Sequence, residues 1–303
     1  MPVDAATARS EAPPERWGLA EGDQIVPGRH ALKRLGGGHR YEAYLAWDDH
    51  LHAIVVAKVL RPHLAYDEKA LRDLAAEADL LARLDHPVLL RSFGCVADGP
   101  RPHLVLEHLE GPRLSSLVRR YGTLPVEQLV PLALQLCSAL HYMAAEGFVH
   151  LDVKPSNIIM GAPPRLIDLS VARSVDAAAR LERPVGTDPY MAPEQCRPVE
   201  LGPMGPAADV WGLGATLHRA AAGERAFSDP DPRATEPERR WPQLIEEPPS
   251  AGDRVPAVIA TCLLECLSFE QNRRPSPAKV AATLEPVFEG LPKPRLSRLK
   301  PRL

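Results

Sequence analysis

The chain has 303 residues, of which 45% are hydrophobic and 25% charged, and its formal net charge is -3. These values are typical of a globular protein with one large domain or two lobes, and the small charge argues against a protein that binds nucleic-acid phosphates. The five cysteines contain no Cys-x-x-Cys pair, so we expect reduced thiols rather than a disulfide framework or a zinc site.

The sequence predicts a protein that neither spans a membrane nor is secreted. No stretch reaches the roughly 18 to 20 uninterrupted apolar residues that a membrane-spanning helix needs. The start of the chain carries Asp4, Arg9 and Glu11 where a signal peptide would have an apolar run. We therefore expect the chain to act in the cytoplasm.

The first third of the chain predicts a small sheet with one helix. Residues 1–26 combine Ala, Pro and charge without a clear period, which is typical of a flexible arm. Apolar runs and turn signals predict three short strands over residues 31–59, with three consecutive glycines, residues 36–38, between the first two. Helical spacing of apolar residues predicts a helix over residues 67–84, and residues 104–106 predict another buried strand.

After Gly111 the pattern becomes helical. Four segments predict long helices, at residues 125–145, 206–222, 255–267 and 277–288. Residues 290–303 form a basic tail, which is either a solvated end or a contact for an acidic partner. The chain is therefore predicted to be α+β, with a small β-rich part followed by a larger helical part.

Three motifs follow one another in the second half of the chain. They are HLDVKPSN at residues 150–157, Asp168 eleven residues after Asn157, and GTDPYMAPE at residues 186–194. An isolated Asp or Asn in such turn-rich sequence is most simply a turn former. The complete set in this order resembles the catalytic loop, the metal-binding D-F-G motif and the A-P-E end of the activation segment of protein kinases.

The resemblance implies a role for each polar residue of these motifs. Asp152 would orient the substrate hydroxyl, and Lys154 would neutralise the transferring phosphate and indicate a Ser/Thr kinase. Asn157 and Asp168 would hold Mg²⁺ or Mn²⁺, since such hard cations prefer oxygen ligands. Thr187 would lie in the substrate site near Asp152 and Lys154.

Lys58, in VVAK at residues 55–58, resembles the lysine that binds the ATP phosphates. A lysine within an apolar strand is costly to bury unless it is paired. Its expected partner is Glu77, nine residues before His86. Asp73 is the alternative, one turn earlier on the same predicted helix and one methylene shorter.

The glycine-rich segment and the hinge of the family are matched less closely. Gly36 and Gly38 correspond to the first two glycines of the loop that covers the phosphates, whereas a simple hairpin would also explain them. The segment from Leu104 to Gly111 resembles the hinge between the two lobes. By this resemblance, Leu106 would close the back of the adenine pocket, and the backbones of Glu107 and Leu109 would bind the adenine edge.

Three further residues are expected to have structural roles. By resemblance, Asp209 would support the catalytic loop, and Glu194 would form a buried ion pair with Arg274. The resemblance covers residues 29–288 and implies a bilobal kinase fold. We predict an N-terminal arm, a small N-lobe, a larger helical C-lobe and a basic tail, at residues 1–26, 27–107, 108–289 and 290–303.

The predicted activity is ATP-dependent phosphorylation of protein hydroxyls, and no oligomeric state is predicted. The sequence departs from the family at Tyr41, Leu151, Leu169 and Ser170. Leu151 replaces the arginine that binds an activating phosphate in many kinases, so we expect activity without phosphorylation of the activation segment. The alternatives are a pseudokinase that acts as a nucleotide-binding or scaffolding module, and a kinase of small molecules.

Overall fold

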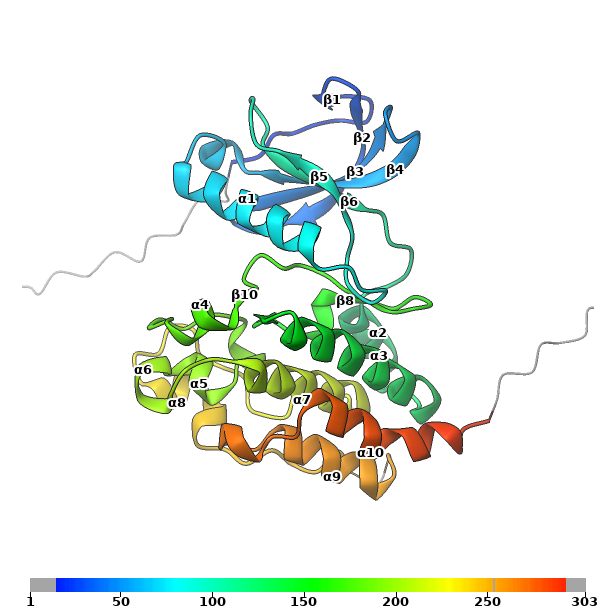
Figure 1. Ribbon diagram of the computed structural model, residues 1–303, viewed down its shortest axis with the longest axis vertical. Coiled ribbons are helices and arrows are strands. Elements are labelled where there is room, and N and C mark those ends of the chain that lie inside the picture. The colour runs from blue at the N-terminus through cyan, green and yellow to red at the C-terminus, as the bar shows by residue number, and fades with distance from the viewer. Residues whose placement is uncertain (1–14, 253, 293–303) are drawn as a thin grey trace, which may run out of the picture. The chain divides into compact units, whose positions relative to one another are not determined.

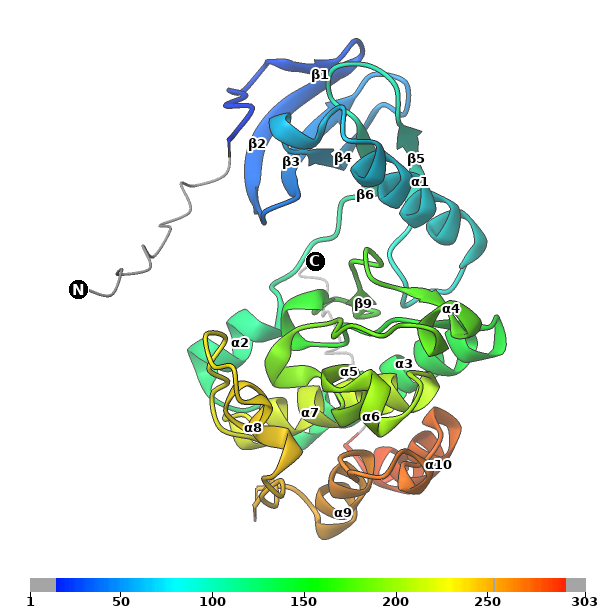
Figure 2. The same cartoon turned by 90° about the vertical axis from the view of Figure 1, so that its left-hand side faces the viewer.

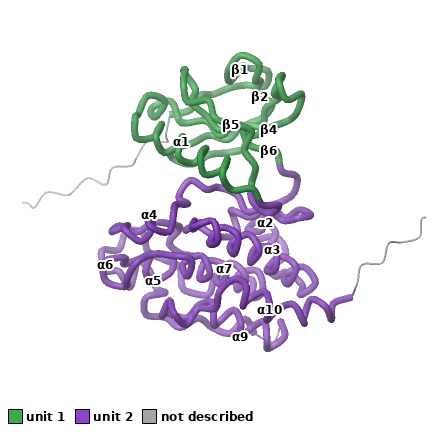
Figure 3. Tube along the Cα trace, in the orientation of Figure 1, with its two compact units in different colours: residues 1–85, 90–108 green, residues 86–89, 109–303 purple. Residues whose placement is uncertain are grey.

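The computed structural model describes residues 15–252 and 254–292, and the chain divides into two compact units. Unit 1 comprises residues 1–85 and 90–108, and unit 2 comprises residues 86–89 and 109–303 (Figure 3). The chain passes from unit 1 to unit 2 after His108, beside the predicted lobe boundary. The predicted basic tail lies outside the described residues from residue 293 onward.

Unit 1 is a six-stranded antiparallel sheet accompanied by one long helix (Figure 1). Its strand order is β1-β2-β3-β4-β6-β5. The elements are β1 (Gln24–Val26), β2 (Arg29–Gly37), β3 (Tyr41–Asp48), β4 (Ala53–Leu60), the 3₁₀ turn η1 (Pro62–Leu64), α1 (Glu68–Arg83), β5 (Ser92–Val96) and β6 (His103–Glu107). The predicted strands and helix are therefore confirmed, and β1 and β5 are additional.

Side-chain alternation explains how the strands of unit 1 form a core. On β4, Val55, Ala57 and Val59 are fully buried against Tyr44 of β3, because every second residue of a strand faces the same side. Helix α1 begins at Asp67, whose carboxylate accepts a hydrogen bond from the backbone N–H of Ala70 at 2.7 Å. One face of the sheet is thus packed in the core, and the alternate residues of β4, including Lys58, lie on the opposite face.

Part of the predicted flexible arm is packed against the sheet of unit 1. Trp17 donates a hydrogen bond from Nε1 to the Leu60 carbonyl at 2.7 Å, and its backbone N–H donates to Glu42 at 3.0 Å. The guanidinium of Arg101 lies 5.1 Å from the Trp17 ring. The expectation of a flexible arm over residues 1–26 is therefore corrected for residues 15–26, and residues 1–14 lie outside the described residues.

Unit 2 is mainly helical and carries two very short sheets (Figures 1 and 2). Strand β7 pairs with β10 and β8 pairs with β9. The α-helices and strands of this unit are α2 (Leu114–Tyr121), α3 (Val126–Ala145), β7 (Phe148–Val149), β8 (Ile158–Ile159), β9 (Arg165–Leu166), β10 (Arg173–Ser174), α4 (Val175–Ala179), α5 (Pro193–Cys196), α6 (Pro198–Leu201), α7 (Pro206–Ala222), α8 (Pro237–Arg240), α9 (Ala257–Cys266) and α10 (Pro277–Glu289). Its 3₁₀ turns are η2 (Pro155–Asn157), η3 (Asp188–Tyr190), η4 (Pro242–Leu244) and η5 (Gln271–Arg273).

Helix α7 is buried along most of its length and forms the centre of unit 2. Two glycines allow this close packing. A Cβ atom added at Gly214 would lie 2.7 Å from the Cβ of Cys266 on α9, and one at Gly212 would lie 3.0 Å from the carbonyl oxygen of Val153. Because these two positions carry no side chain, helix α7 packs closely against both α9 and the loop at residues 150–157.

Among the helices of the described residues, none is both long enough and apolar enough to cross a membrane. All five cysteines are free thiols, as the sequence predicts.

His103 on β6 is fully buried and has a polar partner on each side of its ring. Nδ1 donates to the Arg101 carbonyl at 2.7 Å, and Nε2 accepts from Nη1 of Arg29 at 2.5 Å. Arg29 is itself paired with Asp48. This arrangement requires a neutral ring. Burial, and to a lesser degree the positive charge of Arg29, lowers the pKa of His103 from 6.5 to about 4.

We predict that unit 1 loses stability as the pH falls from about 6.5 to about 4. Because the folded-state pKa lies below the unfolded value, the unfolded chain binds the proton first, and the total loss should be about 3 kcal/mol. Urea unfolding at a series of pH values measures this loss.

His103→Gln is the control, because its amide can still donate and accept hydrogen bonds but does not titrate, so it should flatten the stability curve in this interval. Glu42 and Asp48, whose pKa values lie below their ordinary 4.5 and 3.8, add their own loss of stability from about pH 4.5 downward, so the difference between wild type and variant isolates His103. An unchanged curve in the variant would contradict the assignment.

Candidate active site

Lys58 and Glu77 form an ion pair within unit 1. Lys58 projects from β4 on the side opposite the buried Ala57 and Val59, and Glu77 projects from α1. The lysine Nζ lies 2.8 Å from Oε1 and 3.1 Å from Oε2 of Glu77. Only 14% of the lysine side chain and 3% of the glutamate side chain are exposed. The structure therefore brings together the two residues that the sequence predicts to be partners.

The alternative partner, Asp73, has a different role in the structure. Its carboxylate accepts hydrogen bonds from Arg40 at 2.7 Å and from Lys69 at 3.1 Å. Both contacts are on the partly exposed side of α1, where ion pairs contribute little to stability.

Tyr41, which stands in place of the third loop glycine, covers the lysine. Its ring centroid lies 4.6 Å from Nζ of Lys58, a distance suited to a cation–π interaction. Burial and the neighbouring Glu77 raise the pKa of Tyr41 to about 12, so the phenol stays neutral. The substitution therefore adds an aromatic contact to the lysine rather than only removing a glycine.

The glycine-rich turn depends on a glycine that sequence reasoning did not single out. A Cβ atom added at Gly37 would lie 2.4 Å from the carbonyl oxygen of Tyr41, so no side chain fits there. At Gly36 and Gly38, which the sequence predicts to bind phosphate, an added Cβ would meet nothing within 4 Å. The close approach of β2 and β3 therefore requires glycine at position 37 for steric reasons.

A buried charge network holds this turn, and it was also missed from the sequence. Arg61 donates to the Gly38 carbonyl from Nε at 2.9 Å and from Nη2 at 2.7 Å. Its Nη1 lies 3.3 Å from the carboxylate of Glu42, which is fully buried. Burial opposes ionisation of Glu42, but hydrogen bonds from Tyr44, Trp17 and Arg34 bring its pKa below the ordinary value. Arg61 thus links the glycine-rich turn to the buried, ionised carboxylate of Glu42.

The predicted hinge residues fall at the end of unit 1 and the start of unit 2. Leu106 is buried on β6. The backbone N–H of Glu107 donates to the Arg91 carbonyl at 3.1 Å, and its carboxylate accepts from the backbone N–H of Arg91 at 2.6 Å. Leu109 is half-buried in an irregular segment. The roles of these residues in binding adenine stay predictions.

Asp209 of α7 holds the backbone of the loop at residues 150–157 through hydrogen bonds. The two carboxylate oxygens accept hydrogen bonds from the backbone N–H groups of His150 and Leu151, both at 2.7 Å. Burial raises the pKa of Asp209, opposed by His150 and by these two hydrogen bonds. Leu151 adopts a positive φ of 61°, which is uncommon for a leucine. The next residue, Asp152, makes its side-chain hydrogen bonds with groups outside α7.

Asp152 is the centre of a compact polar cluster in unit 2. Its Oδ1 accepts from Oγ1 of Thr187 at 2.6 Å, and its Oδ2 accepts from Nζ of Lys154 at 2.7 Å. Lys154 also donates to Oγ1 of Thr187 at 2.6 Å, and Asn157 Nδ2 donates to Oδ2 at 3.0 Å. The structure therefore places three residues predicted from sequence, Lys154, Asn157 and Thr187, within hydrogen-bonding distance of Asp152.

The two predicted metal ligands lie on adjacent segments of this unit. The backbone N–H of Ile167 donates to the Asn157 carbonyl at 2.8 Å, which sets Asp168 beside the end of the loop. Asp168 has a positive φ of 70° and is half-buried. Mg²⁺ is usually bound by one or two carboxylates together with nucleotide phosphates. The amide and carboxylate oxygens of Asn157 and Asp168 fit this chemistry, and the described residues contain no cluster of three or more His, Cys, Asp or Glu suited to a metal.

Glu194 and Arg274 form a fully buried bidentate ion pair. Their nitrogen and oxygen atoms lie 2.6 Å and 2.9 Å apart. The guanidinium also donates to the carbonyls of Ser268, Ala207 and Phe269, so each of its nitrogens has a hydrogen bond. A buried ion pair is stable when its remaining donors are satisfied in this way. The contact joins the end of the segment at residues 186–194 to the loop before α10.

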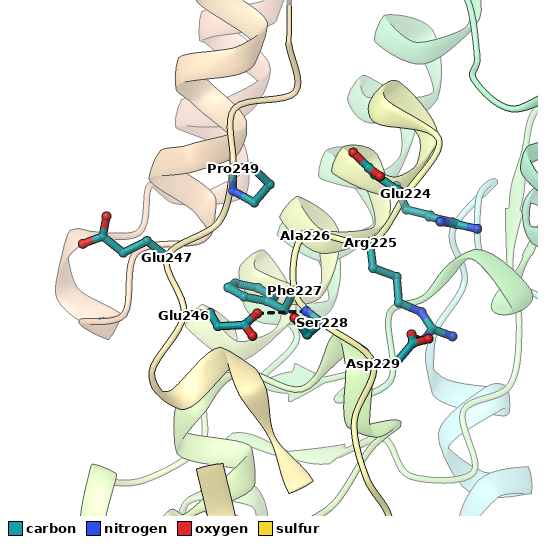
Figure 4. Close-up of a pocket in the computed structure, with 10 residues that line it drawn as sticks. Glu224, Arg225, Ala226, Phe227, Ser228, Asp229, Glu246, Glu247 and Pro249 are labelled. Carbon is teal, nitrogen blue, oxygen red and sulfur yellow. Dashed lines mark hydrogen bonds and ion pairs between the residues drawn. The ribbon is translucent and has the colours of Figure 1, made fainter. Parts of the chain in front are cut away.

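A separate open cavity of about 760 Å³ lies in unit 2 (Figure 4). It is formed by the end of α7, the segment that follows this helix, and residues 246–249, with a hydrogen bond from the Ser228 N–H to Glu246 at 2.9 Å. Its lining residues are Arg219, Glu224, Arg225, Ala226, Phe227, Ser228, Asp229, Glu246, Glu247 and Pro249. None of the predicted active-site residues lines it.

Residues 29–284 match the family model of the protein kinase domain, so the chain belongs to the protein kinase family. The predicted family and the predicted fold class are thereby confirmed. Members of this family use ATP and a divalent metal ion in general.

Several bacterial relatives are similar over most of this chain. It is 29% identical to the serine/threonine-protein kinase PknB of Mycobacterium leprae over 271 residues, which cover 85% of this chain and 42% of PknB. It is 32% identical to the serine/threonine-protein kinase PkaA of Streptomyces coelicolor over 244 residues, covering 78% and 44% of the two chains. The names of these relatives agree with the predicted Ser/Thr class. The chain spans less than half the length of these relatives.

We predict that Lys58→Met abolishes phosphotransfer and also lowers stability. Methionine keeps the apolar stem but leaves the buried Glu77 without its lysine, which should cost roughly 1–3 kcal/mol. Thermal unfolding and an initial-rate assay measure the two effects.

The double variant Lys58→Met, Glu77→Gln separates them. It should recover most of the lost stability, because the buried side chain that lost its lysine no longer carries a charge, while activity stays absent. Recovery of activity in the double variant, or full activity in Lys58→Met, would show that the lysine is not part of the active site.

Proposed function

We propose that this chain transfers the γ-phosphoryl group of ATP to Ser or Thr hydroxyls of protein substrates. The observation that carries the proposal is the polar cluster in which Asp152 accepts hydrogen bonds from Thr187, Lys154 and Asn157. Phosphoryl transfer needs little covalent chemistry from the protein, so positioning of charged groups accounts for most of the catalysis. A cluster of this kind meets that requirement.

The roles follow from the chemistry of each group. Asp152 is the one carboxylate of the cluster, and it orients a substrate hydroxyl and accepts its proton. Lys154 supplies a positive charge close to the same atom, and the ion pair of Lys58 with Glu77 keeps the lysine ammonium ready for the ATP phosphates. Mg²⁺ or Mn²⁺, held by Asn157 and Asp168, would neutralise developing charge on the phosphates.

The departures from the family motifs leave these groups in place. Leu169 is buried and Ser170 half-buried, and neither replaces a charged or ligating group. Tyr41 contacts the predicted phosphate-binding lysine without removing its charge. These observations support an active enzyme over the alternative of a pseudokinase, because a scaffold has no chemical need for the complete set.

The substrate class and location are part of the same proposal. The GTDPYMAPE segment and Lys154 favour a protein hydroxyl over a small molecule as the acceptor. We place the activity in the cytoplasm, where ATP is present and the five free thiols of this chain would stay reduced.

A phosphotransfer assay tests the proposal. With labelled ATP, Mg²⁺ or Mn²⁺ and a generic basic protein, the wild-type chain should label Ser or Thr, and removal of the metal with EDTA should stop the reaction. Asp152→Asn keeps the size of the side chain but removes the proton acceptor, so the rate should fall by about 10²-fold or more. The pseudokinase would be favoured by a thermal shift with ATP that is independent of metal, together with no labelling.

We also predict that the unphosphorylated chain is fully active. Leu151 is buried with Val171, Val175 and Val185, so apolar packing replaces the charged contact that a phosphate would make. Ser174, a hydroxyl residue of the same segment, caps α4 by accepting a hydrogen bond from the Ala177 N–H at 3.2 Å.

The measurement is an initial rate after phosphatase treatment, with mass spectrometry to verify that no phosphate remains. A lag, or a loss of about 10-fold that is reversed as Ser174 or Thr187 becomes phosphorylated, would show instead that the segment is switched by phosphate.

A further inference from the structure

Gln195, which follows Glu194 on α5, uses its whole amide group in hydrogen bonds. Its side chain is buried, and Nε2 donates to the carbonyl oxygens of Leu151 and Val185, both at 2.8 Å. Its Oε1 accepts from the backbone N–H of Ala192 at 3.0 Å. A primary amide has two N–H donors, so both are satisfied here.

The two carbonyls that Gln195 binds flank the central contact of the active site. Leu151 immediately precedes Asp152, and Val185 precedes Gly186 and Thr187. Thr187 Oγ1 in turn donates to Asp152 Oδ1 at 2.6 Å. A single side chain thus bridges the backbones on both sides of the Asp152–Thr187 hydrogen bond, and it fixes their separation.

The backbone at this crossing is tightly packed around Gly186. Gly186 has a φ of +124°, and an added Cβ would lie 2.9 Å from the Leu151 carbonyl oxygen and 3.0 Å from Nε2 of Gln195. The Leu151 side chain packs in the same apolar cluster as Val185 and Ala178. These contacts are hydrogen bonds between uncharged groups and apolar packing, so no phosphate is needed to complete them.

We propose that Gln195 is a positioning residue that holds the activation segment, residues 168–194, against the catalytic loop in the unphosphorylated chain. By bridging Leu151 and Val185, it keeps Thr187 in contact with Asp152. The inference rests on the proposed kinase activity, and it goes beyond it by assigning this task to an uncharged side chain.

A second buried glutamine of unit 2 provides a matched control. Gln243 on η4 is as buried as Gln195, and its Nε2 donates to the carbonyls of Asp188 at 2.7 Å and Met191 at 3.0 Å. Both acceptors belong to the activation segment, so Gln243 supports the segment without joining it to the catalytic loop. A purely structural role would make the two glutamines equivalent.

The experiment compares Gln195→Met with Gln243→Met in the phosphatase-treated full chain. Methionine keeps the length and apolar stem of the side chain and removes the amide. We expect kcat to fall at least about 10-fold in Gln195→Met, with the KM for ATP changed less than about 2-fold, because only the position of the acceptor site is disturbed. In Gln243→Met, kcat should change less than about 3-fold. Equal kcat values in the two variants, or wild-type kcat in Gln195→Met, would overturn the proposal.

Amide hydrogen exchange gives a readout that does not depend on activity. In Gln195→Met, peptides that cover residues 150–153 and 184–188 should both exchange faster, whereas in Gln243→Met only the peptide after residue 187 should change. If the wild-type chain transfers no phosphate, the proposed function fails, and this comparison still decides the role of Gln195. Unchanged exchange at residues 150–153 in Gln195→Met would refute the bridge.

A further variant protects the test against misfolding of Gln195→Met. Gly186→Ala leaves the amide intact but places a Cβ 2.9 Å from the Leu151 carbonyl oxygen, 3.0 Å from Nε2 of Gln195 and 2.9 Å from Cγ of Met191. The crowding should weaken the same hydrogen bond, so we expect the same loss of kcat and the same two exchange changes. Wild-type behaviour in a folded Gly186→Ala protein would also overturn the proposal.

Discussion

The carboxylate of Asp209 accepts hydrogen bonds from the backbone N–H groups of His150 and Leu151 in the interior of unit 2. A buried carboxylate is stable only where donors are directed at it, so the catalytic loop cannot move away from α7 without leaving this group unsatisfied. The absence of a side chain at Gly212 lets the loop come close enough for these bonds to form. The position of Asp152, and through it the cluster with Thr187 and Lys154, depends on this one constraint.

The same principle organises the other buried ionic groups of the chain. Lys58 is paired with Glu77, Arg274 with Glu194, and Arg61 with Glu42. In the last two pairs, hydrogen bonds from the arginine to backbone carbonyls add to the ion pair. Such pairs contribute little net stability compared with apolar residues of the same size, but removal of one partner is costly. Their effect is therefore to fix geometry. The glycine-rich turn and the end of the activation segment are each held by a charged side chain from a distant part of the sequence.

Sequence reasoning predicted the long helices, the central strands and the residues of the active site, because these leave periodic patterns or fixed spacings. Among the groups that hold those residues in place, it predicted Asp209 and the Glu194–Arg274 pair, but it did not predict Gln195 or Arg61. Gln195 reaches carbonyl oxygens 44 and 10 residues away, and Arg61 reaches a carbonyl 23 residues away. Side-chain bonds to backbone carbonyls leave no pattern in residue type, since every residue has a carbonyl. Trp17 was assigned to the flexible arm for the same reason, although a large aromatic residue in a polar segment is a signal of packing.

The cation–π contact between the Tyr41 ring and Lys58 competes with any other group that binds the lysine ammonium. If Lys58 binds the ATP phosphates as proposed, a phosphate that approaches the ammonium from the side covered by this ring would replace one favourable contact with another, so the affinity would reflect the difference between the two. A partly desolvated cation–π contact of about 1–2 kcal/mol corresponds to roughly 5- to 30-fold in a dissociation constant. On the proposed role of Lys58, a substitution of Tyr41 would change nucleotide affinity by weakening this competing contact, without altering the lysine itself.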